Sequence, residues 1–230
     1  NFVDLVDAGN PVDQAKFYSE NGADEICFLD ISASLENRDT LINIVKKTAE
    51  EVFIPLTVGG GIKTVDNIQN LLKAGADKVS INSAALTDPN IIKKSSNYFG
   101  SQCIVVAVDV KKNGNSWSVY SHGGTKNTGI DAIEWLRKIE ELGAGEVLLT
   151  SMDRDGTKLG FDIDILSEAN KILSIPVIAS GGVGSIHHFY EGVKDGGADA
   201  LLAASVFHFN EFSIMDVKNY LKANNIDVRI

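Results

Sequence analysis

Two similar glycine-rich phrases, IPLTVGGGI at 54–62 and IPVIASGGVG at 175–184, stand in one chain of 230 residues. Each joins a short apolar run to glycines, which let the backbone approach a ligand closely. After the next apolar run, each is followed by a small polar segment, Asn82-Ser83 in the first case and Ala204-Ser205 in the second. Exposed backbone N–H groups at the start of a helix bind phosphate oxygens. The paired phrases therefore predict a substrate with two phosphates, rather than two glycine turns of purely structural use.

Aspartates follow several of the apolar runs. Asp109 ends the run CIVVAVD, and Asp30 and Asp155 occupy comparable positions. A carboxyl group in partly apolar surroundings has a raised pKa, which suits general acid or base catalysis. We therefore take Asp109 as the candidate catalytic residue, with a helix cap or support of the following hairpin as its alternative role. Asp155-Gly156 is also typical of a simple turn, and Asn82 is placed to hydrogen-bond a substrate.

Charged residues begin three of the apolar runs, at the opposite ends from the aspartates. They are Glu25, Lys78 and Glu146, and the two glutamates occupy equivalent positions in the two halves of the chain. Two interpretations remain open at this point. The three charged residues are either solvated strand ends or a small ion-pair cluster that closes the bottom of a barrel.

Short β-rich runs alternate with amphipathic helices along the chain and must position these residues. Apolar strands joined by helices are typical of a parallel sheet that is covered on both faces. Asn113-Gly114, between two β-prone stretches, predicts a hairpin added after a barrel strand, and a last helix is expected over about 209–224. The strands are expected at 25–30, 55–58, 78–82, 103–109, 146–151, 176–180 and 199–203.

The second half of the chain repeats the first. NGADEICFLDISAS (21–34) aligns with LGAGEVLLTSMDRDG (142–156), and AGADKVSINSAAL (74–86) aligns with GGADALLAASVFH (196–208). Two halves of about four βα units each would close into one ring. We therefore predict an α/β fold, a (β/α)8 TIM barrel built from two half-barrel repeats, at about 10–110 and 130–225 of a single domain over 1–230. A closed barrel needs eight strands, so the first strand is apparently missing from this chain.

Composition narrows the classes of partner. The net charge of −10 argues against nucleic acid and anionic membranes, which attract clustered Lys and Arg. No apolar run approaches the roughly 20 residues of a membrane span. Cys27 and Cys103 are expected to be buried, reduced thiols of a cytoplasmic protein. The histidines and cysteines form no metal-binding pattern, and we expect neither a metal nor another cofactor.

Several long motifs in one order resemble those of a known family. They are FLDISAS, TVGGGI, GADKVSIN, VVAVDV, HGGTKNTGIDAIEW, LLTSMDRDGTKLGFD, IASGGVG and AASVFHF. Together they resemble the cyclase subunits of imidazole glycerol phosphate synthase, and the resemblance covers essentially the whole chain. It implies an enzyme of histidine biosynthesis that receives ammonia from a glutaminase partner. That family joins the ammonia to a ribulosyl aminoimidazole carboxamide ribotide with a phosphate at each end.

The resemblance also implies roles for particular residues. Asp109 matches one of two catalytic aspartates of the family, while the other belongs to the first strand and is expected upstream of Asn1. Glu25, Lys78 and Glu146 match a charged gate through which ammonia enters the barrel. One phosphate site maps onto Gly61, Asn82 and Ser83, and the other maps onto Gly156, Gly182, Ala204 and Ser205. Thr150, Asp155 and Ser180 fall in the family's active-site strands and loops.

Two alternatives stay open. The sister isomerase of the same pathway acts on a related bisphosphate and has the same repeat, but it needs no ammonia entrance. A non-catalytic phosphate-binding remnant would bind the bisphosphate without converting it. The missing first strand would leave an open barrel with almost no activity in a chain that truly starts at Asn1.

Overall fold

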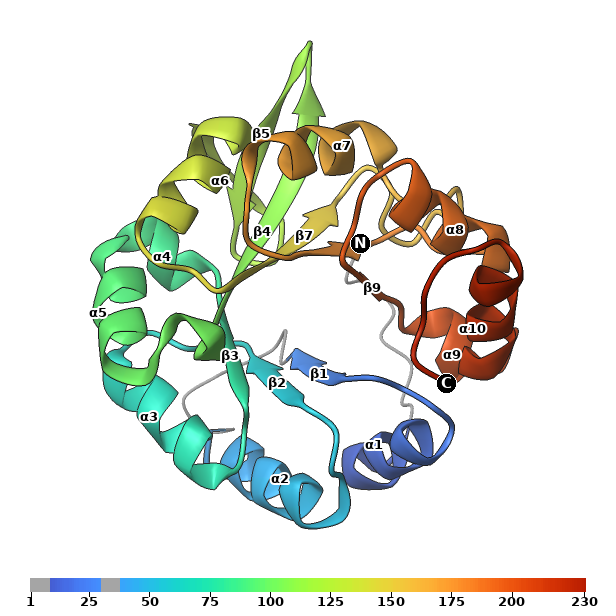
Figure 1. Cartoon of the computed structure of the whole chain (residues 1–230). Helices are drawn as coiled ribbons and strands as arrows, with labels where there is room; N and C mark the ends of the chain where they lie inside the picture. The colour runs from blue at the N-terminus through green and yellow to red at the C-terminus, as the bar shows by residue number, and fades with distance from the viewer. Residues whose placement is uncertain (1–8, 30–37) are drawn as a thin grey trace.

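A curled parallel sheet forms the centre of the molecule in the computed structural model, which describes residues 9–29 and 38–230. Within these residues the parallel strands follow the order β1-β2-β3-β4-β7-β8-β9. The sheet curls into a ring surrounded by helices, the arrangement of a TIM barrel (Figure 1). The strands are β1 (Ile26–Leu29), β2 (Leu56–Gly59), β3 (Lys78–Ile81), β4 (Ile104–Asn113), β7 (Glu146–Ser151), β8 (Val177–Ser180) and β9 (Ala200–Leu202). The α/β barrel class expected from the sequence is confirmed, whereas the strand and aspartate expected upstream of Asn1 stay a prediction.

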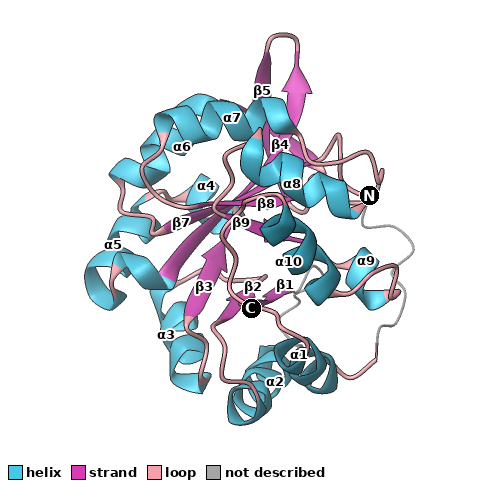
Figure 2. Cartoon of the chain, turned by 45° about the vertical axis from the view of Figure 1, so that its right-hand side comes forward, coloured by secondary structure: helices cyan, strands magenta, loops and turns pink. Residues whose placement is uncertain are grey.

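Helices cover the outer side of the ring (Figure 2). The longer ones alternate with the strands, as parallel connections require. They are α1 (Pro11–Glu20), α2 (Arg38–Glu51), α3 (Val65–Ala74), α5 (Asn90–Phe99), α6 (Ala132–Glu141), α7 (Ile163–Ile172), α8 (Ile186–Lys194) and α10 (Ile214–Ala223). Two short helices, α4 (Ser83–Thr87) and α9 (Ser205–His208), and a 3₁₀ turn (Ser101–Cys103) lie between them.

Each strand has two distinct faces. Val79, Val106 and Val147 point outward and are fully buried against the helices. Their neighbours in sequence point inward, because successive side chains alternate across a strand. We call this inward side the lumen face. The alternation fixes the register of the barrel, since a slip of one residue would expose the outer apolar set.

A β-hairpin projects from the ring beyond β4, as predicted (Figure 1). β4 pairs antiparallel with β5 (Ser116–Ser121), and Gly114 in the turn has a φ of 61°. A third strand, β6 (Lys126–Asp131), pairs with β5 and was not predicted. The following helix α6 begins at Ala132, because Asp131 caps it by accepting hydrogen bonds from the backbone N–H groups of Ile133 and Glu134.

The prediction of one helix over 209–224 is wrong at its start. The chain forms α9, then a loop, and α10 begins only at Ile214. Ser213 caps α10 by a reciprocal pair of hydrogen bonds with Asp216. A capping box of this kind satisfies backbone N–H groups that an uninterrupted helix would have bonded internally, so it sets a helix start.

Polar contacts join the segments near the two ends of the described chain. The ammonium group of Lys218 on α10 lies 2.8 Å from the carboxylate of Asp24. Tyr18 on α1 and His208 on α9 share a hydrogen bond of 2.5 Å. These contacts bring the two ends of the described chain together without strand pairing.

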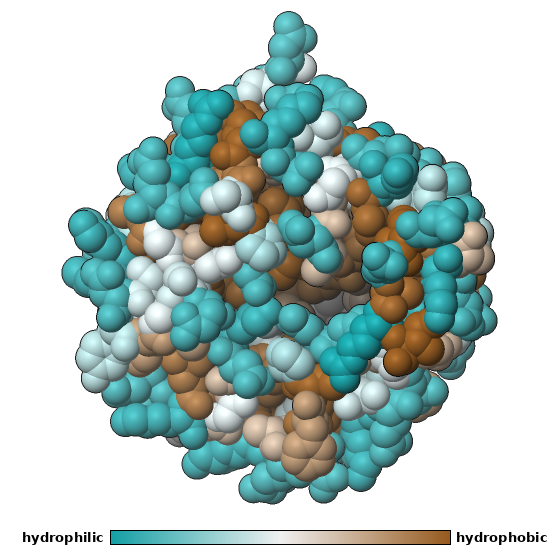
Figure 3. Space-filling view, in the orientation of Figure 1, coloured by the Kyte–Doolittle hydropathy of each residue, from teal (hydrophilic) through white to brown (hydrophobic). Residues whose placement is uncertain are grey.

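The outer surface is predominantly hydrophilic, with hydrophobic residues showing between polar ones toward the centre of the ring (Figure 3). No helix among the described residues is long and apolar enough to cross a membrane. Cys27 and Cys103 are unpaired, and each residue is half-buried rather than fully buried. Cys27 points into the lumen, where burial raises the pKa of its thiol to about 12.

Candidate active site

Three polar side chains form one row across the C-terminal ends of neighbouring strands. Asp109 on β4 pairs with Thr150 on β7, and Thr150 pairs with Ser180 on β8. Because paired residues of adjacent strands point to the same side, all three side chains lie on the lumen face. The row therefore brings together three of the site residues predicted from the sequence.

Asp109 has the surroundings of a general acid or base. Burial raises the pKa of its carboxyl group to about 6, a hydrogen bond from Asn82 lowers it, and the negative charge of Asp155 raises it further. The Asn82 Nδ2 atom lies 2.9 Å from Asp109 Oδ2. The oxygen of the same amide, Asn82 Oδ1, is buried and has no hydrogen-bond partner among the described residues. A carboxyl group of this pKa exchanges a proton readily near neutral pH.

Two glycine turns follow β2 and β8 and lie at the same end of the barrel, because both strands are parallel. Gly61 has a φ of 60° and Gly182 a φ of 101°, in the left-handed region that favours glycine. A Cβ atom on Gly182 would lie 2.2 Å from the carbonyl oxygen of Gly160. The Gly160 N–H donates to the Gly182 carbonyl oxygen at 2.7 Å, so two backbone segments pack directly against each other here.

The remaining predicted residues at this end lie beside the two turns. Ser83 begins α4, and its Oγ accepts a hydrogen bond of 3.1 Å from the backbone N–H of His122. Ala204 and Ser205, at the start of α9, are exposed. Asp155 and Gly156 lie in the turn after β7, where the Asp155 N–H donates to the Ser151 carbonyl oxygen. Asp30 lies outside the described residues.

The three charged residues at the N-terminal ends of the strands do meet. Lys78 Nζ lies 3.0 Å from both carboxylate oxygens of Glu25 and 2.6 Å from Glu146 Oε1. Burial alone would lower the pKa of Lys78, but the hydrogen bonds to the two glutamates raise it overall. Of the two interpretations left open by the sequence, the ion-pair cluster is therefore present.

Comparisons with known proteins identify the family of this chain. Residues 1–213 match the family model described as "Histidine biosynthesis protein". "Imidazole glycerol phosphate synthase subunit HisF" from Clostridium botulinum (strain 657 / Type Ba4) is 58% identical over 232 residues, covering 100% of this chain and 92% of the relative. The same subunit from strain Okra / Type B1 is 57% identical with the same coverage. The chain belongs to the histidine biosynthesis protein family, among the HisF subunits of imidazole glycerol phosphate synthase.

This membership confirms the family expected from the sequence motifs. It also favours the cyclase over the sister isomerase, because the curated relatives carry the name of the synthase subunit. Among residues 9–29 and 38–230, no group of three or more His, Cys, Asp or Glu side chains is arranged to hold a metal ion.

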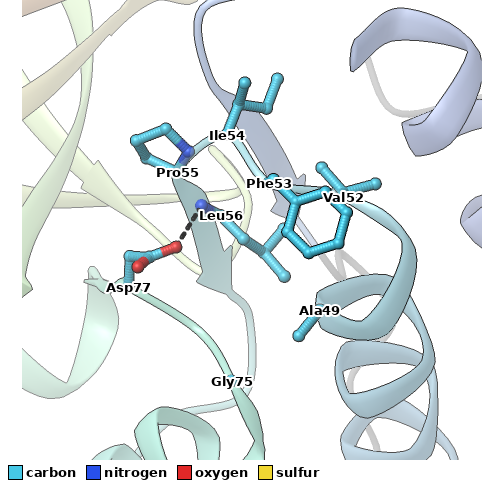
Figure 4. Close-up of a pocket in the computed structure, with 8 residues that line it drawn as sticks. All are labelled: Ala49, Val52, Phe53, Ile54, Pro55, Leu56, Gly75 and Asp77. Carbon is cyan, nitrogen blue, oxygen red and sulfur yellow. Dashed lines mark hydrogen bonds between the residues drawn. The ribbon is translucent and has the colours of Figure 1, made fainter. Parts of the chain in front are cut away.

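A surface pocket of about 270 Å³ lies at the charged end of the barrel, away from Asp109. Its residues lie around the start of β2 and the ends of α2 and α3 (Figure 4). Asp77 borders it and accepts a hydrogen bond of 2.8 Å from the Leu56 N–H. Phe53, with 89% of its surface exposed, is the most exposed of the large apolar side chains in the described chain. The pocket is thus a feature of the face that carries the ion-pair cluster, not of the opposite end, which carries Asp109.

Sequence reasoning missed Tyr120, which lies beside Asp109. Tyr120 on β5 pairs directly with Asp109 on β4. The signal was present in the predicted hairpin: Asn113 pairs with Ser116 across the turn, and counting four residues outward along each strand reaches Asp109 and Tyr120.

Proposed function

We propose that this chain catalyses the cyclase reaction of imidazole glycerol phosphate synthase. It joins ammonia, released by a glutaminase partner, to a ribulosyl aminoimidazole carboxamide ribotide that carries two phosphates. The products are imidazole glycerol phosphate and aminoimidazole carboxamide ribotide. Identity of 58% to HisF subunits over the full chain supports the reaction. The single structural observation that supports it most is a half-buried Asp109, with a pKa of about 6, between two glycine turns at one rim.

The substrate is held by its two phosphates. One binds near Gly61, Asn82 and Ser83, and the other near Gly156, Gly182, Ala204 and Ser205. Backbone N–H groups can bind phosphate by donating hydrogen bonds to its oxygens, without net positive charge, which is compatible with a chain of net charge −10. The proposal takes the chain as one barrel domain whose halves, about 10–110 and 130–225, each supply one of these sites. Thr150, Ser180 and Asp155 line the space between them.

Asp109 acts as a general acid or base on the bound substrate. The Asn82 amide holds one carboxylate oxygen, which fixes the direction in which the other oxygen can exchange a proton. Binding at both ends confines the reacting carbon above this carboxyl group. Such positioning can lower the activation free energy of the reaction by several kcal/mol.

Ammonia reaches Asp109 through the lumen. The route begins at the ion-pair cluster of Lys78, Glu25 and Glu146, which acts as the gate. Small or apolar side chains on the lumen face lead from the gate to the rim, among them Thr57, Ser80, Ala107 and Leu148. A passage with little water keeps ammonia unprotonated and prevents its loss.

The glutaminase docks at the gate end, where its ammonia would enter directly. An exposed Phe53 beside a pocket supports this choice of face, because aromatic side chains often anchor interfaces. The proposal places the chain in the cytoplasm, which is supported by two unpaired cysteines.

The reaction is tested with purified protein that includes the strand and aspartate expected upstream of Asn1, together with the bisphosphate substrate and ammonium salt at high pH. Turnover that requires ammonium is expected, and Asp109→Asn should reduce it at least about 100-fold. Asp227→Asn, an exposed aspartate near the C-terminus, is the matched control and should keep full activity. Conversion without ammonium would favour the isomerase, and binding without any conversion would favour a non-catalytic phosphate-binding protein.

The docking face is tested separately. Phe53→Ser should weaken binding of the glutaminase at least about 10-fold and lower glutamine-dependent turnover, while ammonium-dependent turnover stays unchanged. Phe17→Ser, on an exposed position of α1 in the ring of helices, is the control and should change neither activity. Equal effects of the two substitutions would contradict the assignment of this face.

A further inference from the structure

The polar row at the catalytic rim continues into the projecting hairpin. Tyr120 on β5 lies opposite Asp109, and Asn127 on β6 lies opposite Tyr120. The hairpin motif that holds these residues, from 116 to 131, has no role in the function proposed above. The row therefore places an aromatic side chain next to the candidate catalytic carboxyl group.

The Tyr120 ring and the Asp109 carboxyl group lie on the same side of the sheet. Directly opposed residues of antiparallel strands have Cβ atoms about 4.5–5.5 Å apart and point the same way. The neighbouring pair, Val110 and Val119, is fully buried on the outer face, so the Asp109–Tyr120 pair must face the lumen side. The Trp117 ring, which lies below the Lys112 ammonium group on that outer face, agrees with the alternation.

The outer end of the Tyr120 ring is held in place. Asn127 Nδ2 donates a hydrogen bond of 3.3 Å to the Tyr120 hydroxyl group. Asn127 is itself held, because its Oδ1 accepts a hydrogen bond of 2.8 Å from the Gly129 N–H. Tyr120 is half-buried. A half-buried ring fixed at both ends presents a flat apolar surface at the rim.

We propose that Tyr120 is a positioning and substrate-contact residue, whose ring shields the Asp109 carboxyl group from water and packs against the heterocycle of the substrate. The packing against a heterocycle rests on the proposed function, since it requires a substrate with an aromatic ring. Aromatic rings prefer offset-stacked or edge-to-face contacts, so one ring fixed beside the reacting group would orient another. Tyr120 acts by its ring, and its hydroxyl group serves to hold the ring through Asn127.

The groups that act on the Asp109 charge come from three sides. Asn82 from the end of β3 stabilises the charged form, and Asp155 from the turn after β7 opposes it. Burial is the largest influence, and Tyr120 from β5 is the adjacent side chain on the hairpin side. Removal of the ring should therefore act on Asp109 by letting water in.

The shielding is tested by carbon-13 NMR titration of the Asp109 carboxyl group, assigned by comparison with Asp109→Asn. Tyr120→Phe and Tyr120→Leu keep an apolar cover and should leave the midpoint within about 0.3 units of the wild type. Tyr120→Ala should lower the midpoint by about one unit or more, toward the ordinary carboxyl value. An unchanged midpoint in Tyr120→Ala, with native circular dichroism, would overturn the shielding.

The stacking is tested by the affinities of two ligands, aminoimidazole carboxamide ribonucleotide and ribose 5-phosphate, which lacks the heterocycle. Tyr120→Leu should weaken the nucleotide about 3- to 10-fold and leave ribose 5-phosphate unchanged, while Tyr120→Phe changes neither. Tyr98→Ala, which removes an exposed tyrosine on α5, is the control and should change neither affinity. Equal loss for both ligands, or loss in Tyr120→Phe equal to that in Tyr120→Leu, would overturn the assignment.

The two proposals fail in different ways. An absence of ammonium-dependent turnover in the wild-type chain would refute the proposed function. The titration midpoints of the Tyr120 variants need no turnover, so they report on the shielding independently.

Discussion

Replacing Asp109 by asparagine should make the protein more stable while it removes activity. The carboxyl group has a pKa of about 6 in the folded chain, against an ordinary value of 3.8. The folded state thus disfavours the charged form, mainly because of burial. Asparagine has nearly the same shape, can still accept the hydrogen bond from Asn82, and has no charge to desolvate.

The size and sign of the effect follow from the two pKa values. At 1.36 kcal/mol per pKa unit, the difference between the folded and the ordinary pKa corresponds to about 3 kcal/mol of unfolding free energy at pH 8. The contribution of the carboxyl group to wild-type stability is fully present below about pH 4 and is lost as the pH rises through about 6. The free energy of unfolding of Asp109→Asn should therefore exceed that of the wild type by about 1 kcal/mol at pH 4.5, and this excess should grow by about 2 kcal/mol by pH 8.

Urea unfolding of both proteins between pH 4.5 and pH 8 measures this difference. Asp227→Asn is the control, because this aspartate is exposed and follows the last helix, and its difference from the wild type in unfolding free energy should not change with pH. A flat difference for Asp109→Asn would refute the inferred burial of charge at this position. A loss of activity without any gain in stability would show that Asp109 is not held in an unfavourable charged form.

Three further substitutions test other parts of the fold and site. Lys78→Met removes the cation between two glutamates and should lower the free energy of unfolding by about 2–4 kcal/mol, because Glu146, with a side chain 17% exposed, keeps its charge without a partner. Adding Glu146→Gln should recover at least half of this loss, and no recovery would contradict the ion-pair explanation. Gly182→Ala places a Cβ atom 2.2 Å from a carbonyl oxygen and should lower the melting temperature clearly more than Gly114→Ala, where the space is open. Equal losses would show that the two backbone segments in contact at Gly182 can move apart. Ser213→Ala removes the cap of α10 and should cost about 1 kcal/mol in urea unfolding, whereas no loss would mean that packing alone sets this helix start.

Much of the fold could be predicted because it depends on local sequence patterns. All seven strands expected in the described chain are present, since each is a short apolar run between helices. The hairpin at Gly114 followed from its turn residues. The capping of α10 by Ser213 was equally local, but it was overlooked, so the predicted helix started too early.

Other features depend on residues that are far apart in the sequence. Lys78 lies 53 residues from Glu25 and 68 from Glu146, and only strand pairing brings the three charges together. For that reason the sequence could not distinguish an ion-pair cluster from solvated strand ends. The strand β6 was missed for a similar reason, because its pairing partner β5 supplies most of what defines it.

The sequence by itself determined the alternation of strands and helices, the two glycine turns and the position of Asp109 at a strand end. These properties follow from the period of apolar residues and from the backbone conformations that glycine allows. Only the tertiary structure decided that Asn82 bonds Asp109 at 2.9 Å and that Asp155 acts on the same carboxyl group. Proton affinity depends on burial and on neighbouring charges, and both are set by the packing of distant segments.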